Sequence, residues 1–197
     1  MTCWVVIPVK RPGDGKQRLS SALDEAGRTA LVGAMVTQVF GAADAARNVA
    51  KTFLLGPSRH GLPEAIPLLF APGQGLNPAL QAALAQVAES GISRVVFIAG
   101  DLPQVTAQDI ELLAAAARGA IAIAPDRHEI GTNALSLPLP EAAGFIFAFG
   151  TDSFARHHTE AGRLGLAIET IHRQGLALDI DQPADLADAA GLMQQPR

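Results

Sequence analysis

The middle of the chain reads Arg94-Val95-Val96-Phe97-Ile98-Ala99-Gly100-Asp101-Leu102-Pro103. The consecutive apolar residues from Val95 to Ile98 predict a strand over Arg94–Ala99 that is buried on both faces of a sheet. Amphipathic stretches lie on both sides of this run, at Asn77–Ser90 and Thr106–Arg118. Helix, strand and helix in alternation indicate βαβ units, so we expect an α/β fold with a largely parallel sheet.

The same alternation continues toward both ends of the chain. We expect further strands at Cys3–Val9, Thr52–Leu55, Ile66–Phe70, Ala120–Pro125, Thr132–Leu137, Gly144–Phe149, Ala167–Thr170 and Ala177–Ile180. Helices are expected at Asp24–Ala45, from the N-cap Asn77 to Ser90, from Thr106 with its capping-box partner Asp109 to Arg118, from Thr151 or Asp152 to Gly165, and from Pro183 onward. No repeat or interdomain linker interrupts the pattern, which predicts one domain over residues 1–197.

Composition and charge narrow the class of protein. Of the 197 residues, 49% are hydrophobic and 17% are charged, as in ordinary globular proteins. The net charge of −4 argues against a nucleic-acid-binding protein, and it means that a polyanionic substrate needs a local basic pocket. The single cysteine, Cys3, excludes an internal disulfide and a cysteine-based zinc cluster. No apolar run reaches the ~20 residues that span a bilayer, and no signal-peptide pattern precedes Cys3, so we expect a cytoplasmic protein without membrane contact.

A basic loop follows the first predicted strand, at the strand end where open α/β sheets bind their ligands. Residues 8–19 run from Pro8 to Leu19 and carry cations at Lys10, Arg11, Lys16 and Arg18. Glycines in the loop let backbone N–H groups approach an anion, and lysines supply point charges for phosphate oxygens. The alternative is a solvated loop without a ligand; in either case we expect Lys16 to be exposed. The loop lacks the G-x-x-x-x-G-K-[ST] signature, which disfavours P-loop chemistry.

Three aspartates are candidates for a cation site. Asp101 follows the central strand and would face the ligand crevice. Asp179 and Asp181 are two positions apart, so both point to the same side of an extended segment. Carboxylates this close favour a hard cation such as Mg²⁺ or a nearby lysine. A turn-forming aspartate and an exposed acidic strand end are the alternatives, but the three aspartates together with the basic loop favour a metal–phosphate site.

Small and hydroxyl-bearing residues point to further anion contacts. Residues 73–77, Gly-Gln-Gly-Leu-Asn, adjoin a helix N-terminus that favours an anion or a polar ring edge, although a helix cap alone explains them. Gly131-Thr132-Asn133 and Gly150-x-x-Ser153 suit a second phosphate. His157 and His158 point about 100° apart on their helix, so they are not expected to bind one metal; such a histidine is more often partly buried and hydrogen-bonded. Signatures of hydrolase triads and of dinucleotide oxidoreductases are missing.

In their order along the chain, these segments resemble the 2-phospho-L-lactate guanylyltransferase family of coenzyme F-420 biosynthesis, which includes phosphoenolpyruvate and 3-phospho-D-glycerate guanylyltransferases. The match runs through Pro8-x-Lys10, Lys16-x-Arg18-Leu19, Gly75-Leu76-Asn77, Gly100-Asp101-Leu102-Pro103, Pro125-Asp126-Arg127, Gly131-Thr132-Asn133, Phe149-Gly150, Ser153-Phe154-x-x-His157 and Asp179-x-Asp181-x-Pro183-x-Asp185-Leu186. Each piece alone is unspecific, whereas the ordered set covers almost the whole chain.

The resemblance implies a nucleotidyltransferase fold of the glycosyltransferase-A type, a three-layer αβα sandwich around a mixed, mostly parallel sheet. It implies GTP as donor, a small phosphorylated carboxylic acid as acceptor and pyrophosphate as leaving group. Carried over by position, the Mg²⁺ ligands are Asp101, Asp179 and Asp181, which are catalytic together with Lys16. The implied nucleotide-binding residues are Pro8, Lys10, Lys16, Arg18, Gly75, Asn77 and Asp101; among them Lys10, Lys16 and Arg18 meet the triphosphate, and Gly75 and Asn77 the nucleoside. The implied residues for the acceptor phosphate are Thr132, Gly150 and Ser153.

The sequence leaves two other functions open. One is another small nucleotidyltransferase, acting on molybdopterin or a sugar phosphate; those enzymes usually begin with a Gly-Gly-x-Ser-x-Arg loop, where this chain has Val9-Lys10-Arg11-Pro12-Gly13. The other is a non-catalytic nucleotide-sensing module, which would be favoured if the three aspartates failed to converge. The sequence does not rank phospholactate, phosphoenolpyruvate and 3-phosphoglycerate as acceptors, and it leaves a homodimer open.

Overall fold

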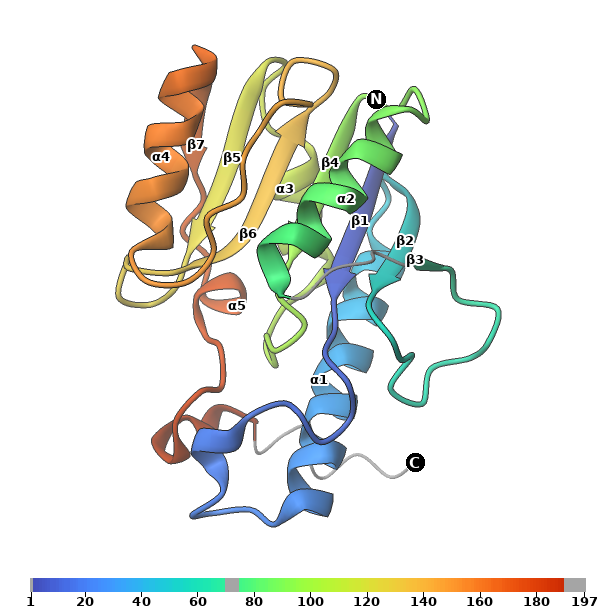
Figure 1. The fold of residues 1–197 in the computed structure, drawn as a ribbon, viewed down its shortest axis with the longest axis vertical. Coiled ribbons are helices and arrows are strands. Elements are labelled where there is room, and N and C mark those ends of the chain that lie inside the picture. The colour runs from blue at the N-terminus through green and yellow to red at the C-terminus, as the bar shows by residue number, and fades with distance from the viewer. Residues whose placement is uncertain (1, 70–74, 190–197) are drawn as a thin grey trace.

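Seven strands form one mixed sheet (Figure 1). The computed structural model describes residues 2–69 and 75–189, and within them the strand order is β3-β2-β1-β4-β6-β5-β7. The strands are β1 (Cys3–Pro8), β2 (Val49–Leu55), β3 (Leu68–Leu69), β4 (Arg94–Ile98), β5 (Ala120–Pro125), β6 (Thr132–Pro138) and β7 (Ala167–Thr170). β6 is antiparallel to β4 and β5, and the other pairs are parallel. The expected mixed, mostly parallel sheet is therefore confirmed.

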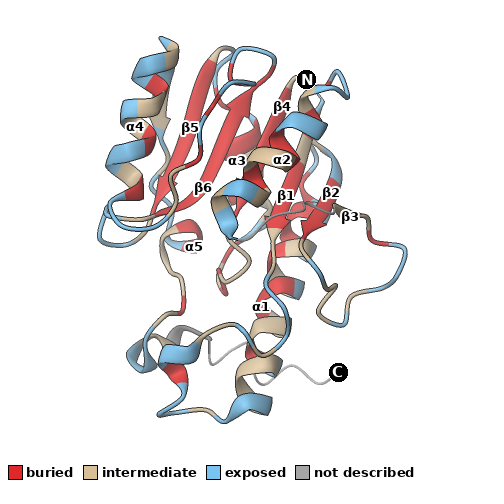
Figure 2. Ribbon diagram, in the orientation of Figure 1, coloured by how far each residue is buried: buried red, intermediate tan, exposed pale blue. Residues whose placement is uncertain are grey.

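Helices cover both faces of the sheet and complete three layers (Figure 1). On one face an apolar core contains residues of α1 (Glu25–Ala45), α3 (Ala107–Ala114) and α5 (Gln174–Ala177), with α3 ending one turn earlier than expected. On the other face a second core contains residues of α2 (Leu76–Ala88) and α4 (Ser153–Leu164). Every residue of β4, β5 and β6 is buried (Figure 2), which explains the unbroken apolar run in the middle of the chain. Within the described residues, no helix is long and apolar enough to cross a membrane.

A short loop reverses the chain between β5 and β6. The carboxylate of Asp126 accepts hydrogen bonds from the backbone N–H groups of His128, Ile130 and Gly131. A Cβ atom at Gly131 would lie 2.7 Å from Asp126 Oδ2, so a larger residue there would displace this carboxylate from its hydrogen bonds. Because β6 is antiparallel to its neighbours, Thr132 at its start lies at the sheet edge where β4 and β5 end.

Beyond this edge of the sheet, the first loop and the last segment of the chain meet beside the start of α1 (Figure 1). The loop contains the 3₁₀ helix η1 (Gln17–Leu19), and the last segment contains a second 3₁₀ helix, η2 (Pro183–Ala189), where a short helix was expected. Leu19, Leu31 and Ile180 belong to a small buried cluster between them. This cluster brings the basic loop to the acidic segment, although the two are distant in sequence.

Two expected strands are absent from the described residues, and one is shorter. Gly144–Phe149 has no strand structure, because Phe145 and Phe147 are buried in the second core without a neighbouring strand to pair with. Ala177–Ile180 forms the end of α5 and an irregular segment. At Ile66–Phe70 only β3 is a strand, and residue 70 lies outside the described residues.

The helix starts lie close to the expected positions, but one N-cap differs. Thr106 and Asp109 form the expected capping box. α2 begins after Gly75, whose φ of 104° suits glycine, so Asn77 lies in the first turn and is not the N-cap. Asp152 precedes α4 in a left-handed conformation, and its side chain makes no capping hydrogen bond.

Candidate active site

Lys16 lies between two of the three candidate aspartates. Its ammonium nitrogen Nζ is 2.5 Å from Asp101 Oδ2 and 2.8 Å from Asp181 Oδ1. Asp101 follows β4, Asp181 lies in the last segment, and Lys16 precedes η1 with a left-handed φ of 57°. The Lys16 side chain is only 9% exposed, so the expectation of an exposed loop lysine is wrong. The structure thus joins the basic loop to the acidic residues at the edge of the sheet.

The ionisable groups of this cluster are electrostatically coupled. Burial acts to lower the pKa of Lys16, but the charges and hydrogen bonds of Asp101 and Asp181 outweigh it and raise this pKa. Burial acts to raise the pKa of Asp181, but the hydrogen bond and charge of Lys16, with the charge of Arg18, bring it below its ordinary value. For Asp179, burial and repulsion from Asp101 and Asp181 raise the pKa. Asp179 is therefore within electrostatic reach of Asp101 and Asp181.

The chemistry of these donors fits a hard cation. Carboxylate oxygens are the ligands that Mg²⁺ prefers, and two carboxylates, those of Asp101 and Asp181, share the buried ammonium of Lys16. Within residues 2–69 and 75–189, no three Asp, Glu, His or Cys side chains are already arranged as a metal site. The ammonium group of Lys16 lies between the carboxylates of Asp101 and Asp181, so a cation of the protein itself offsets the repulsion between them.

The other cations of the basic loop are open to solvent. Lys10 is exposed, two residues after Pro8, which ends β1. The side chain of Arg18 is 71% exposed and lies 3.9 Å from Asp181 Oδ2. Lys10 and Arg18 both contribute to the lowered pKa of Asp181, after the larger effects of burial and of Lys16. They therefore lie within electrostatic reach of the acidic segment, and their side chains are accessible to an anion.

Two residues that sequence reasoning left without a role hold the acidic segment in place. Asp185 Oδ2 accepts hydrogen bonds from the backbone N–H groups of Asp181 and Gln182, at 2.9 and 2.7 Å. Arg127, in the β5–β6 loop, donates to the carbonyl of Asp179 at 3.0 Å and lies 3.3 Å from Asp185 Oδ1. The sequence signal is that of a capping box, in which an acidic residue at the third helical position reaches back to the N-cap N–H.

A second polar group lies at the start of β6. Thr132 Oγ1 and His157 Nδ1 are 2.9 Å apart, and His157 Nε2 accepts a hydrogen bond from the N–H of Ala148 at 3.1 Å. His157 is 1% exposed and Thr132 is 6% exposed. Ser153, also buried, lies one turn before His157 on the same side of α4. The structure therefore brings two of the predicted acceptor-site residues, Thr132 and Ser153, to the same interface, together with a histidine that is buried and hydrogen-bonded.

Asn77 fixes the chain that leads into α4. Its side-chain oxygen accepts a hydrogen bond from the N–H of Phe149 at 2.8 Å, and its nitrogen donates to the Phe149 carbonyl at 3.0 Å. Gly150 follows with a φ of 121°. The nucleoside contacts of Asn77 and Gly75 stay a prediction, and residues 73–74 of the same loop lie outside the described residues.

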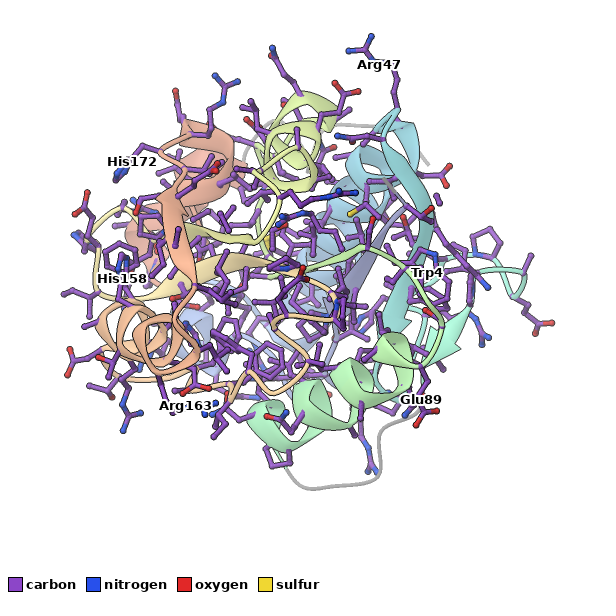
Figure 3. The ribbon with its side chains drawn as sticks, turned by 90° about the horizontal axis from the view of Figure 1, so that it is seen from above. Trp4, Arg47, Glu89, His158, Arg163 and His172 are labelled. Atoms are coloured by element: carbon purple, nitrogen blue, oxygen red, sulfur yellow. The ribbon has the colours of Figure 1, made fainter. Side chains whose placement is uncertain are left out.

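Two other histidines lie outside these polar groups. His172 points away from the molecule (Figure 3); its side chain is 61% exposed and lies 3.6 Å from Glu129. His158 lies on α4 (Figure 3). Its ring packs edge-on against the ring of Phe154, with 4.6 Å between the ring centroids. Neither contacts Lys16 or Thr132 through a hydrogen bond, whereas His157 contacts Thr132. His60 contacts the basic loop instead, with a ring nitrogen 2.7 Å from the Lys10 carbonyl oxygen.

Residues 3–190 match the protein family described as Guanylyl transferase CofC like. The chain belongs to this family. A phosphoenolpyruvate guanylyltransferase from Sphaerobacter thermophilus is 40% identical over 197 residues, which cover 97% of this chain and 94% of the relative. A 2-phospho-L-lactate guanylyltransferase from Halorubrum lacusprofundi is 32% identical, over 93% of this chain and 82% of the relative. A solved structure from Desulfovibrio desulfuricans, described as a nucleotide-diphospho-sugar transferase, has a TM-score of 0.74 at 19% identity, over 94% of this chain and 84% of that one.

Membership of the CofC-like family confirms the resemblance read from the ordered motifs. The fold is that of the nucleotide-diphospho-sugar transferases, as expected for a glycosyltransferase-A type sandwich. The enzyme class is also confirmed: this CofC-like protein is a nucleotidyltransferase of the guanylyltransferase kind. Its two polar groups, one around Lys16 and one around Thr132, lie at the same edge of the sheet.

Proposed function

We propose that this CofC-like protein transfers GMP from GTP to the phosphate of a small phosphorylated carboxylic acid and releases pyrophosphate. The observation that carries the proposal is the presence of two polar groups at one sheet edge, Lys16 with Asp101 and Asp181, and Thr132 beside α4. The first suits a triphosphate with its cation, and the second suits a separate phosphate. Relatives that are named phosphoenolpyruvate and 2-phospho-L-lactate guanylyltransferases support this choice of substrates. On the resemblance, we assign the reaction to coenzyme F-420 biosynthesis.

On the nucleotide side, the exposed cations of the basic loop would bind the triphosphate. Lys10 and Arg18 are accessible and close to the acidic segment, and Pro8 directs the chain from β1 toward it. Gly75 and Asn77, at the start of α2, would contact the nucleoside. The Mg²⁺ ligands in this proposal are Asp101, Asp179 and Asp181. When bound there, Mg²⁺ would supply neutralisation of the negative charge on the triphosphate.

The chemical step follows from the charges of the two substrates. An oxygen of the acceptor's phosphate attacks the α-phosphorus of GTP and forms a new P–O bond, while the bond between that phosphorus and the bridging oxygen to the β-phosphate breaks. Because the attacking oxygen is already ionised, no general base is required, and positioning with charge neutralisation supplies most of the catalysis. The ammonium of Lys16 would stabilise the negative charge on the departing pyrophosphate.

On the acceptor side, the start of α4 and the start of β6 would hold the phosphate. Ser153 is the first residue of α4, where the helix dipole attracts an anion. The N–H groups of Ser153 and Phe154 already donate to the carbonyls of Gly150 and Ile130, so the Ser153 hydroxyl is the donor that this helix start would offer. Gly150 has a φ of 121°, which allows the chain to turn just before this helix. Thr132 would add a hydroxyl donor from β6.

The test is a substrate matrix measured by pyrophosphate release. The protein is incubated with Mg²⁺, each nucleoside triphosphate in turn, and phosphoenolpyruvate, 2-phospho-L-lactate or 3-phospho-D-glycerate, with a sugar phosphate as competing acceptor class. We expect release with GTP and at least one of the three acids, and none from Asp101→Asn. Release with a sugar phosphate but with none of the acids would overturn the proposal, as would equal rates with all triphosphates.

A further inference from the structure

His157 is a buried histidine with both ring nitrogens in hydrogen bonds. It is 1% exposed, with Nδ1 2.9 Å from Thr132 Oγ1 and Nε2 3.1 Å from the backbone nitrogen of Ala148. Two directional contacts in a buried position fix the orientation of the ring. The chemistry proposed above uses the hydroxyl of Thr132 but gives no role to the ring behind it.

The backbone partner determines which ring nitrogen carries the proton. The N–H of Ala148 can only donate, so Nε2 must accept with its lone pair and carries no hydrogen. Burial lowers the pKa of His157 to about 4, so the ring is neutral at neutral pH and has one N–H proton. That proton is therefore on Nδ1, and Nδ1 donates to Thr132 Oγ1.

This tautomer determines what the hydroxyl of Thr132 offers to a ligand. A hydroxyl has one proton and two lone pairs, and here the oxygen accepts from His157. Among the described residues, the Thr132 hydroxyl makes no other hydrogen bond, so its proton is available. Phosphate oxygens accept hydrogen bonds, so a free hydroxyl proton attracts them. In the opposite tautomer, Nδ1 would accept the hydroxyl proton of Thr132, and the hydroxyl oxygen would present only its lone pairs to the anion.

We propose that His157 is a positioning residue that donates from Nδ1 to Thr132 and thereby directs the Thr132 hydroxyl proton to the acceptor's phosphate. The inference rests on the proposed function, because it assumes that Thr132 meets the phosphate of the acceptor acid. It assigns His157 a role in the affinity for that acid and none in the binding of GTP.

Two substitutions separate the two hydrogen bonds of His157. The amide nitrogen of asparagine can take the place of Nδ1, so His157→Asn keeps a donor for Thr132. The amide oxygen of glutamine can reach the place of Nε2, so His157→Gln keeps an acceptor for Ala148 and loses the donor. His157→Gln should raise the acceptor KM roughly tenfold, as expected for the loss of one oriented hydrogen bond, while GTP binding measured without acceptor is unchanged. His157→Asn should recover most of that loss, and His158→Gln on the same helix is the matched control.

A double variant tests whether His157 acts through Thr132. Thr132→Val removes the hydroxyl with little change of shape and should itself raise the acceptor KM. In that background His157→Gln should change the acceptor KM by less than about twofold, because no hydroxyl proton remains to be directed. Additive effects of the two substitutions would overturn the inference, and so would a His157→Asn variant as impaired as His157→Gln.

The tautomer can be measured without any substrate. A long-range ¹H–¹⁵N correlation spectrum of the histidines in the whole protein at neutral pH should show His157 protonated at Nδ1 and bare at Nε2. A proton on Nε2, or a charged ring, would overturn the inference and leave the proposed function standing. A wild-type protein with the expected tautomer that transfers GMP to none of the three acids would instead overturn the proposed function, together with the acceptor role of Thr132.

Discussion

Replacement of Asp179 and of Asp181 by asparagine should change stability in opposite directions, although both changes should abolish transfer. Asp181 accepts a hydrogen bond from Lys16 at 2.8 Å, whereas burial and repulsion from Asp101 and Asp181 raise the pKa of Asp179. Asp181→Asn therefore removes an attractive partner of Lys16, and Asp179→Asn removes a repulsive neighbour. In the metal-free protein, the first change should lower the free energy of unfolding and the second should raise it.

The size of each effect follows from the contact that is lost. A hydrogen bond between charged groups contributes about 1.5–3 kcal/mol, but the Asp181 side chain is 50% exposed, and solvent screening reduces this to about 1 kcal/mol. For a chain of this length, that corresponds to a fall in Tm of about 2–4 °C. Relief of repulsion in Asp179→Asn should add about 0.5–1 kcal/mol, in the range of other substitutions that remove strain at functional sites.

The assay is thermal unfolding in the presence of a chelator, at neutral pH and low salt, together with pyrophosphate release in Mg²⁺. Glu89→Gln is the matched control, since it removes one exposed carboxylate at the end of α2 (Figure 3). Added salt should shrink both shifts in Tm, because partly exposed charges are screened. If Asp179→Asn melts below the wild type while Glu89→Gln melts with it, Asp179 makes a stabilising contact and the repulsion argument is refuted.

Lys16→Ala leaves two carboxylates without their shared cation, so the metal-free variant should melt several degrees below the wild type. In a thermal-shift titration, Mg²⁺ should raise the Tm of the variant by more than it raises that of the wild type. Equal increases in Tm would contradict the placement of Lys16. Asp185→Asn weakens the hydrogen bonds to the backbone of Asp181 and should raise the Mg²⁺ concentration for half-maximal activity, measured against an unchanged GTP KM. Ser153→Ala should raise the acceptor KM by about one to two decades, since a charge-assisted hydrogen bond is lost, while the affinity for GTP stays unchanged. A fall in GTP affinity with an unchanged acceptor KM would mean that the two phosphate sites are assigned the wrong way round. Burial lowers the pKa of His157 from 6.5 to about 4, so between these pH values the unfolded state binds more protons than the folded state. The free energy of unfolding should therefore fall by up to about 3 kcal/mol as the pH is lowered from 6.5 to 4. Urea titrations at stepped pH should show a smaller fall for His157→Asn.

Strands buried on both faces could be predicted directly from the sequence. The strands Arg94–Ile98 and Ala120–Pro125 agree with the expected strands to within one residue. A short, continuous apolar run between two helices is too short for a helix of its own and is typical of a buried strand. Gly144–Phe149 shows the limit of this reasoning. Its alternating phenylalanines are buried, as they would be in a strand. The preceding strand, β6, already pairs with β4 on one side and β5 on the other, so this segment cannot pair with β6. The local sequence contains no sign of that pairing.

The candidate site also has one part that the sequence predicts and one part that it does not. The acidic residues and the basic loop could be predicted because charged groups interrupt apolar runs at strand ends. The burial of Lys16 could not, because it depends on Asp181, 165 positions away. The supporting contacts of Arg127 with Asp179 and of Thr132 with His157 span 52 and 25 positions, and such pairs leave no spacing in the sequence.

The antiparallel strand β6 determines how the two polar groups of the candidate site are placed. In a sheet of parallel strands, only residues that follow a strand reach the ligand-binding edge. The Asp126-capped loop reverses the chain, so the first residues of β6 reach that edge as well: Ala134 pairs with Ile98, and the N–H of Ala99 donates to the Asn133 carbonyl at 2.8 Å. Thr132 therefore begins the strand that is adjacent to β4, and Asp101 lies three residues beyond the end of β4; the backbones of such neighbouring strands lie ~5 Å apart. In the proposed reaction this strand pairing would set the spacing between the two polar groups, and the side chains would orient the two phosphates for in-line attack.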